Sequence, residues 1–326
     1  MSALPTQVRI NEEGPREGFQ IAGAGVPTGK KVELIDRLSA TGLKQIQVAS
    51  FVNPKRVPGM ADATEVVARY QRNPAVRYTA LWLNDQGFRR ALATERVDLV
   101  GRIVLCASPA FLKRNQNMTL QENLESHRRQ IKTYLDHGVP VTHGGLQAAF
   151  GCNFEGEIST EQVLAVAADA FSLAAEFGLE LKTFVLADTM AWASPSSVRR
   201  TVDAFREKFP AVEIILHLHD TRGLGLANAL AGLQAGVASF DTAVAGLGGC
   251  PFAEHRGAAG NLCTEDFVFM CHEVGIETGI DLEALIDVAR FAEEIIGYPL
   301  PGSVMLGGSL KKLRAAAAAQ STDKAS

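Results

Sequence analysis

Two histidines, His217 and His219, stand two residues apart in the sequence HLHD, at the end of an apolar run. Side chains at positions i and i+2 of a β-strand point to the same face, so both imidazoles can face one site. A lone histidine is more often a satisfied core residue, but a pair at this spacing predicts half of a divalent-metal site. Asp220 follows directly and suits two roles equally: a hydrogen bond to one imidazole, or a cap for the next helix.

Oxygen ligands for such a site are available near both ends of the chain. Residues 11–18, NEEGPREG, place carboxylates and a guanidinium in what reads as a glycine-bounded turn after the first expected strand. Asn261 follows a glycine-rich segment after the last expected strand and can supply a carbonyl oxygen. Glu17, His217, His219 and Asn261 can converge only if those strands are neighbours in a closed barrel. A mixed nitrogen and oxygen set suits Mg²⁺ or Mn²⁺, with Zn²⁺ and Co²⁺ as alternatives.

A second candidate site is the segment 245–252, AGLGGCPF, which has three glycines in four positions and then a cysteine. Cys250 has two interpretations. It is either an inert thiol in a glycine turn, or a thiol on a movable loop that donates or accepts a proton beside the metal.

The elements that must position these residues alternate between short β-rich runs and longer helical patterns. Strict alternation predicts parallel strands, and eight of them predict an α/β fold, a (β/α)₈ TIM barrel. An open doubly wound sheet is the runner-up, but no GxGxxG follows the first strand. The expected strands cover residues 8–11, 45–49, 77–83, 99–106, 141–149, 180–186, 213–219 and 239–243.

Helix starts and the C-terminal region complete the expected architecture. Thr119 with Glu122 predicts a capping box for a long helix, and Thr160 is expected to cap the next one. Residues 264–274 and 281–296 predict additional C-terminal helices beside the barrel. We therefore expect one catalytic domain over 1–310, and a fraying or disordered tail over 311–326.

Composition narrows the class of protein. The chain has 326 residues, a formal net charge of −4 and five cysteines without CxxC spacing. These values predict a cytoplasmic protein of a reducing compartment, with no nucleic acid partner and no disulfide framework. No stretch approaches the roughly 20 apolar residues that span a bilayer, so no membrane partner is expected.

Several motifs together resemble one known family. The run from Glu13 to Gln20 resembles the EVGPRDGLQ signature of 3-hydroxy-3-methylglutaryl-CoA lyases, in the metal-dependent lyase and Claisen-synthase superfamily of TIM barrels. The GGCP loop is similar to the lyase branch rather than to the isopropylmalate and homocitrate synthases. Matches in the same order extend over residues 8–275, at SFVNPK (50–55), GCNFEG (151–156), HLHDT (217–221), AGLGGCP (245–251) and GNLCTED (260–266).

The resemblance implies roles for individual residues. The metal would be held by Glu17, His217, His219 and Asn261. Arg16 would contact the substrate and stabilise negative charge on oxygen, Cys250 would transfer a proton, and Asp188 would complete the catalytic set. The residues expected to bind substrate are Arg16, Gln20, Gln47 and Lys55, with the pairs Lys55–Arg56 and Lys113–Arg114 as candidates for the phosphates of coenzyme A.

Three departures from the family pattern bear on the substrate. Glu17 stands in place of an aspartate, Gln47 in place of a glutamate, and the segment 188–193, DTMAWA, in place of DTxGxG. Trp192 either reshapes the pocket or packs beneath its loop. The expected activity is that of an oxo-acid-lyase, a metal-dependent carbon–carbon lyase that cleaves a 3-hydroxyacyl-CoA carboxylate to acetyl-CoA and a keto acid.

Alternatives to this activity stay open. The substrate could be citramalyl-CoA, which would give acetyl-CoA and pyruvate. The chain could instead be a Claisen-type synthase of the citramalate or isopropylmalate kind, or a catalytically weakened metal-binding barrel. An acyl-CoA is the expected small-molecule partner, and a homo-oligomer is left open.

Overall fold

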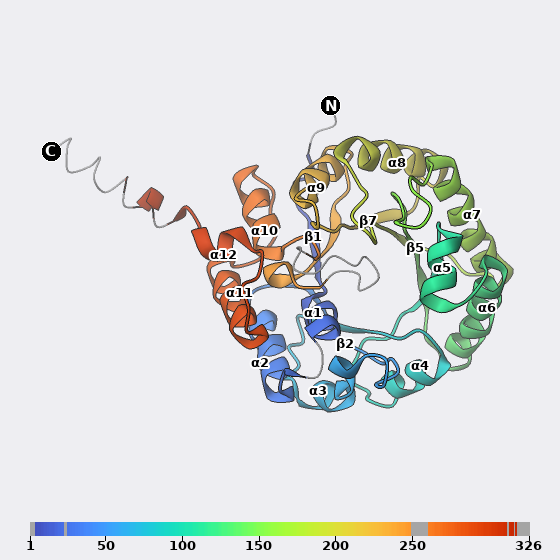
Figure 1. Ribbon diagram of the computed structural model, residues 1–326, viewed down its shortest axis with the longest axis horizontal. Helices are drawn as coiled ribbons and strands as arrows, with labels where there is room; N and C mark the ends of the chain where they lie inside the picture. The colour runs from blue at the N-terminus through green and yellow to red at the C-terminus, as the bar shows by residue number, and fades with distance from the viewer. Residues whose placement is uncertain (1–3, 23–24, 249–259, 312, 316, 318–326) are drawn as a thin grey trace.

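The computed structural model describes residues 4–22, 25–248, 260–311, 313–315 and 317. Its eight named strands are parallel and form one sheet that curls into a barrel (Figure 1). The strands are β1 (Arg9–Glu12), β2 (Gln45–Ser50), β3 (Arg77–Leu81), β4 (Gly101–Cys106), β5 (Val141–Gln147), β6 (Thr183–Ala187), β7 (Glu213–His217) and β8 (Ser239–Thr242).

The strand order, β3-β2-β1-β8-β7-β6-β5-β4, makes neighbours of strands that follow one another in the chain and pairs β1 with β8. The first, seventh and eighth strands therefore end beside one another, as convergence of the candidate ligands requires. The predicted TIM-barrel fold with additional C-terminal helices is confirmed. The predicted strands all occur, with ends that differ by up to three residues.

The last edge of the barrel, between β3 and β4, is closed without a ladder of strand pairs. Before β4, the amide of Asp98 donates to the carbonyl of Tyr78 at 2.6 Å, and the Asp98 carboxylate accepts from the Tyr78 amide at 2.8 Å. Farther along, Nη2 of Arg102 donates to the carbonyl of Ala80 at 3.2 Å. Backbone and side-chain hydrogen bonds thus join this edge, and Arg102 reaches from β4 to β3.

Helices surround the sheet, and Figure 1 shows most of them as a ring outside the strands. Apolar side chains of the strands and helices pack in a buried layer between the sheet and the surrounding helices, and this layer holds the short strands in position. The helices are α1 (Gly14–Ala22), α2 (Thr28–Ser39), η2 (Pro58–Met60), α3 (Ala63–Arg69), α4 (Asp85–Leu92), α5 (Pro109–Gln116), α6 (Leu120–Asp136), α7 (Thr160–Glu176), α8 (Pro195–Lys208), α9 (Gly225–Gln234), η3 (Val244–Gly246), α10 (Thr264–Glu273), α11 (Leu282–Ile296) and α12 (Ser303–Gly307).

Local predictions around the helix starts have mixed outcomes. The capping box of Thr119 and Glu122 at the start of α6 is confirmed. The cap of α7 is Ser159 and not Thr160, because Ser159 has the extended backbone of a cap and its hydroxyl accepts from the Gln162 amide.

The expected turn over residues 11–18 is also wrong, because α1 begins at Gly14. Pro15 falls in the first turn of this helix, where a missing N–H costs nothing, and Glu17 lies near the positive end of the helix dipole.

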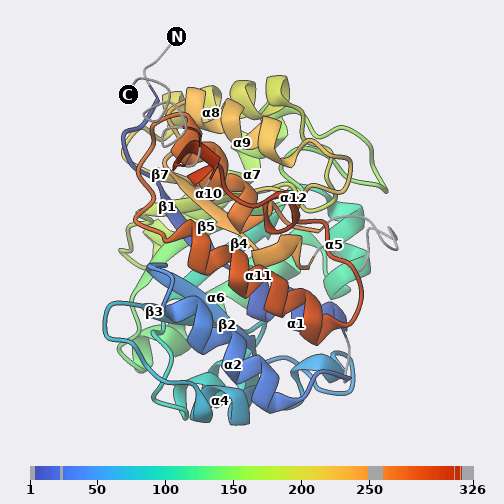
Figure 2. The same ribbon diagram turned by 90° about the vertical axis from the view of Figure 1, so that its left-hand side faces the viewer.

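The C-terminal helices α10, α11 and α12 pack together on one side of the barrel, next to α1 and α2 (Figure 2). The first part of the expected tail continues as helix at 311, 313–315 and 317, and residues 318–326 lie outside the described residues. Within the part of the chain that the structure describes, no helix has the length and hydropathy needed to cross a bilayer.

Candidate metal centre and active site

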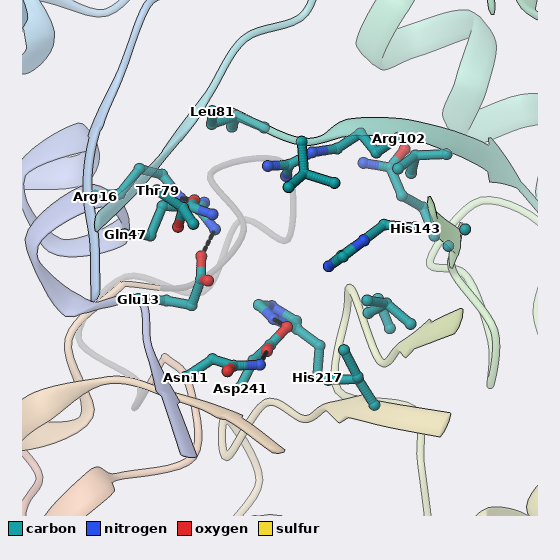
Figure 3. A pocket seen from close by; sticks show the side chains of 18 of the residues that line it. Asn11, Glu13, Arg16, Gln47, Thr79, Leu81, Arg102, His143, His217 and Asp241 are labelled. Atoms are coloured by element: carbon teal, nitrogen blue, oxygen red, sulfur yellow. Dashed lines mark hydrogen bonds and ion pairs between the residues drawn. The ribbon is translucent and has the colours of Figure 1, made fainter. Parts of the chain in front are cut away.

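The barrel encloses a cavity of about 580 Å³. Glu213 and His217, the first and last residues of β7, both line it, so the cavity runs along the full length of the strand. The interior of a TIM barrel is usually filled by layers of bulky apolar side chains. Here many inward positions carry polar side chains instead, and Figure 3 shows them around the open space.

The four predicted ligands come together at one end of this cavity, where the carboxyl ends of the strands lie. Oε1 of Glu17, on α1, lies 4.0 Å from Nε2 of His217. His219 forms an isolated antiparallel bridge with Asn261, and its ring centroid lies 5.2 Å from that of His217. Nδ2 of Asn261 donates to Oε2 of Glu17 at 3.2 Å. Three segments far apart in the sequence therefore supply the set.

The state of these groups fits a divalent cation. Nε2 of His219 is buried without a hydrogen-bond partner among the described residues. Burial and the neighbouring His217 lower the pKa of His219 to about 4, so its imidazole is neutral. Burial disfavours the Glu17 anion, but Arg16 and the two histidines outweigh it and lower the pKa of Glu17 to about 2. A neutral imidazole with a free nitrogen beside a carboxylate anion is the donor set that a metal requires.

Gly248 allows Glu17 and Asn261 to approach each other. Its φ is +95°, which favours glycine, and a Cβ there would lie 2.5 Å from Cβ of Glu17 and 2.4 Å from Nδ2 of Asn261. Gly248 of the AGLGG segment thus has a packing role at the candidate metal centre. Cys250, the predicted proton-transfer residue, lies outside the described residues.

Asp241 orients the first histidine. Its Oδ2 lies 3.2 Å from Nδ1 of His217, and its Oδ1 accepts from the Asn11 amide at 2.9 Å. The hydrogen bond leaves Nε2 of His217 facing Glu17, as in the carboxylate–histidine pairs of many metal sites. Burial alone would lower the pKa of His217, and Asp241 reverses that shift. Of the two roles open to Asp220, the helix start is observed, since its Oδ1 accepts from the Gly225 amide at 2.5 Å.

Arg16 is held on three sides. Its Nε donates to Oε1 of Gln47, its Nη1 donates to Oε1 of Glu17, and its Nη2 donates to Oε2 of Glu13 at 2.5 Å. Burial opposes the charge of Arg16, but Glu17 and Glu13 outweigh it and raise its pKa further. A guanidinium has five N–H groups, so two remain for a substrate oxygen.

Glu13 is a candidate functional residue to which the sequence analysis assigned no role. It is buried, lines the cavity, and provides a carboxylate to Arg16 where Gln47 provides a neutral amide. The signal was present in the motif, because the EVGPRDGLQ signature has valine where this chain has Glu13. The negative charge beside the arginine has thus moved from β2 to the end of β1.

Three predicted substrate or catalytic residues lie in different surroundings. Gln20 lines the cavity, and its Oε1 has no partner among the described residues. Lys55 is exposed and does not line the cavity. Asp188 is buried, but its Oδ1 accepts from the amides of Trp192 and Ala193, so it organises the loop after β6 rather than facing the cavity.

Trp192 packs against the neighbouring loop. A Cβ on Gly151 would lie 2.6 Å from the Trp192 side chain, and Nε1 of the indole donates to Oδ1 of Asn153 at 2.7 Å. The indole does not line the cavity. Of the two interpretations of Trp192, the geometry favours packing, which ties the loops after β5 and β6 together.

Another group of metal-binding side chain types, Cys263, Glu265 and Asp266, lies close together and buried at the start of α10. The two carboxylates of this group accept hydrogen bonds from backbone amides. Glu265 accepts from the Ala245 amide, and Asp266 accepts from the amides at the start of α12. This cluster therefore joins α10 to η3 and α12.

Comparison with known proteins gives a consistent result. The HMGL-like family model matches residues 7–292. The cytoplasmic 3-hydroxy-3-methylglutaryl-CoA lyase of Homo sapiens is 37% identical over 89% of this chain and 76% of its own. The Bacillus subtilis HMG-CoA lyase structure has a TM-score of 0.84 at 35% identity, and covers 93% of this chain and 98% of its own.

A structure of an HMG-CoA lyase from Acinetobacter baumannii in complex with coenzyme A and 3-methylmalate is also similar. It has a TM-score of 0.83 at 36% identity, and covers 95% of this chain and 97% of its own.

Proposed function

Because the chain belongs to the HMGL-like family and is a carbon–carbon lyase of the HMG-CoA lyase type, we propose that it cleaves a 3-hydroxyacyl-CoA carboxylate in a divalent-metal-dependent reaction. The products would be acetyl-CoA and a keto acid. The observation that carries the proposal is the convergence of Glu17, His217, His219 and Asn261 beside Arg16 at one end of the cavity.

The substrate class follows from the relatives and from the site. The Acinetobacter relative binds coenzyme A and 3-methylmalate, which supports a thioester and a dicarboxylate skeleton here. We propose 3-hydroxy-3-methylglutaryl-CoA or a close analogue, with citramalyl-CoA as the analogue to test first, because Glu13 and Gln47 alter the surroundings of Arg16. The proposed compartment is the cytoplasm, since the relatives include cytoplasmic lyases.

Cleavage of the carbon–carbon bond requires a distinct role of the metal, of Arg16 and of Cys250. Mg²⁺ or Mn²⁺, held by the four ligands, would supply Lewis acidity, which makes an alcohol more acidic. The substrate hydroxyl loses its proton to solvent, its oxygen forms the ketone C=O, and the electron pair of the breaking carbon–carbon bond passes to the thioester as an enolate. The two remaining N–H groups of Arg16 would stabilise the charge on the enolate oxygen. The enolate carbon then takes up a proton, which Cys250 is predicted to supply.

The test is a panel of coenzyme A thioesters with Mg²⁺ or Mn²⁺, in which released acetyl-CoA is measured by chromatography. We expect metal-dependent release from at least one 3-hydroxyacyl-CoA carboxylate, and none from His219→Ala. His272→Ala is the matched control, because His272 is exposed on α10 and should leave turnover unchanged. Absence of release from the whole panel, or product formation from acetyl-CoA and a 2-oxo acid alone, would contradict a lyase.

A further inference from the structure

The middle of the cavity holds an arginine without an acidic partner. Arg102 lies on β4 and its guanidinium points into the open space (Figure 3). Among the described residues its hydrogen bond is the one to the carbonyl of Ala80, and it forms no ion pair with a carboxylate. Desolvation consequently lowers the pKa of Arg102. A guanidinium that lines a cavity and binds no carboxylate of the described residues has the capacity to bind an anion there.

His143 stands beside it. Arg102 and His143 are direct partners in the register of β4 and β5, and both side chains point into the cavity (Figure 3). Side chains at paired positions lie about 5 Å apart, near enough to bind one ligand together. Nδ1 of His143 contacts the hydroxyl of Thr142, and its Nε2 has no partner among the described residues.

Thr79 adds a buried donor from the strand across the open edge. It is 8% exposed and lines the cavity, and its hydroxyl has no hydrogen-bond partner among the described residues. Thr79 is the register partner of Gln47 on β2, and the next residue, Ala80, accepts the hydrogen bond from Arg102 on β4, so Thr79 lies on the cavity wall between Gln47 and Arg102 (Figure 3). A buried hydroxyl without a partner is costly, and a carboxylate oxygen would satisfy it.

The acids nearest to Arg102 do not fill this role. Glu13 is paired with Arg16, and Asp241 is bound by Asn11 and His217. Electrostatic interactions nevertheless link both acids to His217 on one side and to Arg102 on the other. Arg102 is the second residue of β4 and His217 the last residue of β7, so Arg102 lies nearer the amino ends of the strands than the candidate metal ligands, in the same cavity.

We propose that Arg102, His143 and Thr79 form a subsite for the free carboxylate of the acyl group, at the end remote from the thioester. The inference rests on the proposed function and specifies its substrate. An acyl group held at Arg16 would extend down the barrel, and its carboxylate would accept hydrogen bonds from the Arg102 guanidinium. After cleavage this carboxylate belongs to the keto acid, so the subsite binds that product as well.

The experiment compares Arg102→Gln with Arg77→Gln. Arg77 lines the same cavity at the start of β3, so both variants remove one positive charge from it. For the thioester that the wild type cleaves, we expect Arg102→Gln to raise KM about 10- to 100-fold, as for the loss of charge-assisted hydrogen bonds. Arg77→Gln should stay within about threefold, because Arg77 pairs in register with Gln45, two residues before the Gln47 that holds Arg16. Equal effects of the two variants would overturn the subsite.

Calorimetric titration with free 3-methylmalate separates this inference from the proposed function. The dicarboxylate should bind the wild type and Arg77→Gln alike, and bind Arg102→Gln about tenfold or more weakly. Unchanged affinity would refute the subsite even if the protein is a lyase, and a selective loss would support it even if no thioester is cleaved. His143→Gln, which should weaken binding less, provides the same test if Arg102→Gln does not fold.

Discussion

Replacing Glu13 by glutamine tests whether this residue is the acidic partner of Arg16. The ion pair joins Oε2 of Glu13 to Nη2 of Arg16 at 2.5 Å, and the two side chains are 6% and 12% exposed. Arg16 keeps Glu17 and Gln47, so the change should loosen the guanidinium rather than release it. Misplacement of a positioning group by about 1 Å can cost about 100-fold in rate, so kcat/KM should fall about 10- to 100-fold.

The second variant returns the charge to β2. Because Gln47 accepts from Nε of the same guanidinium, Glu13→Gln combined with Gln47→Glu restores one carboxylate to Arg16. Acetyl-CoA release by the double variant should recover to within about tenfold of the wild type. Gln47→Glu alone should shift preference toward the 3-hydroxy-3-methylglutaryl ester. A double variant no better than Glu13→Gln alone would show that the charge has no positioning role, and so would wild-type turnover in the single variant.

Three further predictions concern the metal centre and stability. His219→Ala should abolish turnover and weaken Mn²⁺ binding while the protein still folds, because Nε2 of His219 has no hydrogen-bond partner among the described residues; calorimetry and thermal melts check this. Asp241→Asn should weaken Mn²⁺ binding about 10- to 100-fold by releasing His217, and unchanged affinity would count against an orienting role. Burial raises the pKa of Glu12 from 4.5 to about 8, so the folded state retains a proton that the unfolded chain loses, and stability should fall as pH rises through this range. In urea titrations Glu12→Gln should lose about 2–3 kcal/mol less than the wild type between pH 5.5 and 7.5, and equal losses would mean that Glu12 is ionised throughout.

The fold could be predicted from the sequence because its signal is local and repeated. Each strand is a short apolar run, and each is followed by a helical pattern, so an error of a few residues at one end leaves the topology unchanged. Ends are less certain where two capping residues adjoin, as at Ser159 and Thr160. The NEEGPREG segment failed for a different reason. Glycine and proline usually mark a turn, but both are tolerated in the first turn of a helix.

The candidate site was predictable only in part. The spacing of His217 and His219 is a local signal, and both side chains reach the cavity. The role of Asp241 depends on the pairing of β7 with β8, where His217 and Asp241 are register partners 24 positions apart in the chain. Nothing near Asp241 distinguishes it from any other aspartate. His143 stands out in the sequence as a histidine inside the fifth predicted strand, but no role could be assigned to it. Its proximity to Arg102 is a property of strand register.

Different residues of the barrel stabilise the fold and line the cavity. The main apolar core of this barrel includes the layer between the sheet and its helices, with residues such as Phe184 and Phe205. Gly145 faces inward beside Val104 and Val185 and supplies no side chain, which leaves the lumen open. A change at Arg102 or Gln47 therefore removes little buried apolar surface, and should alter binding far more than stability. This division would allow residues such as Glu13 and Gln47 to exchange a charge around Arg16 while the four proposed metal ligands stay in place at the carboxyl end of the cavity.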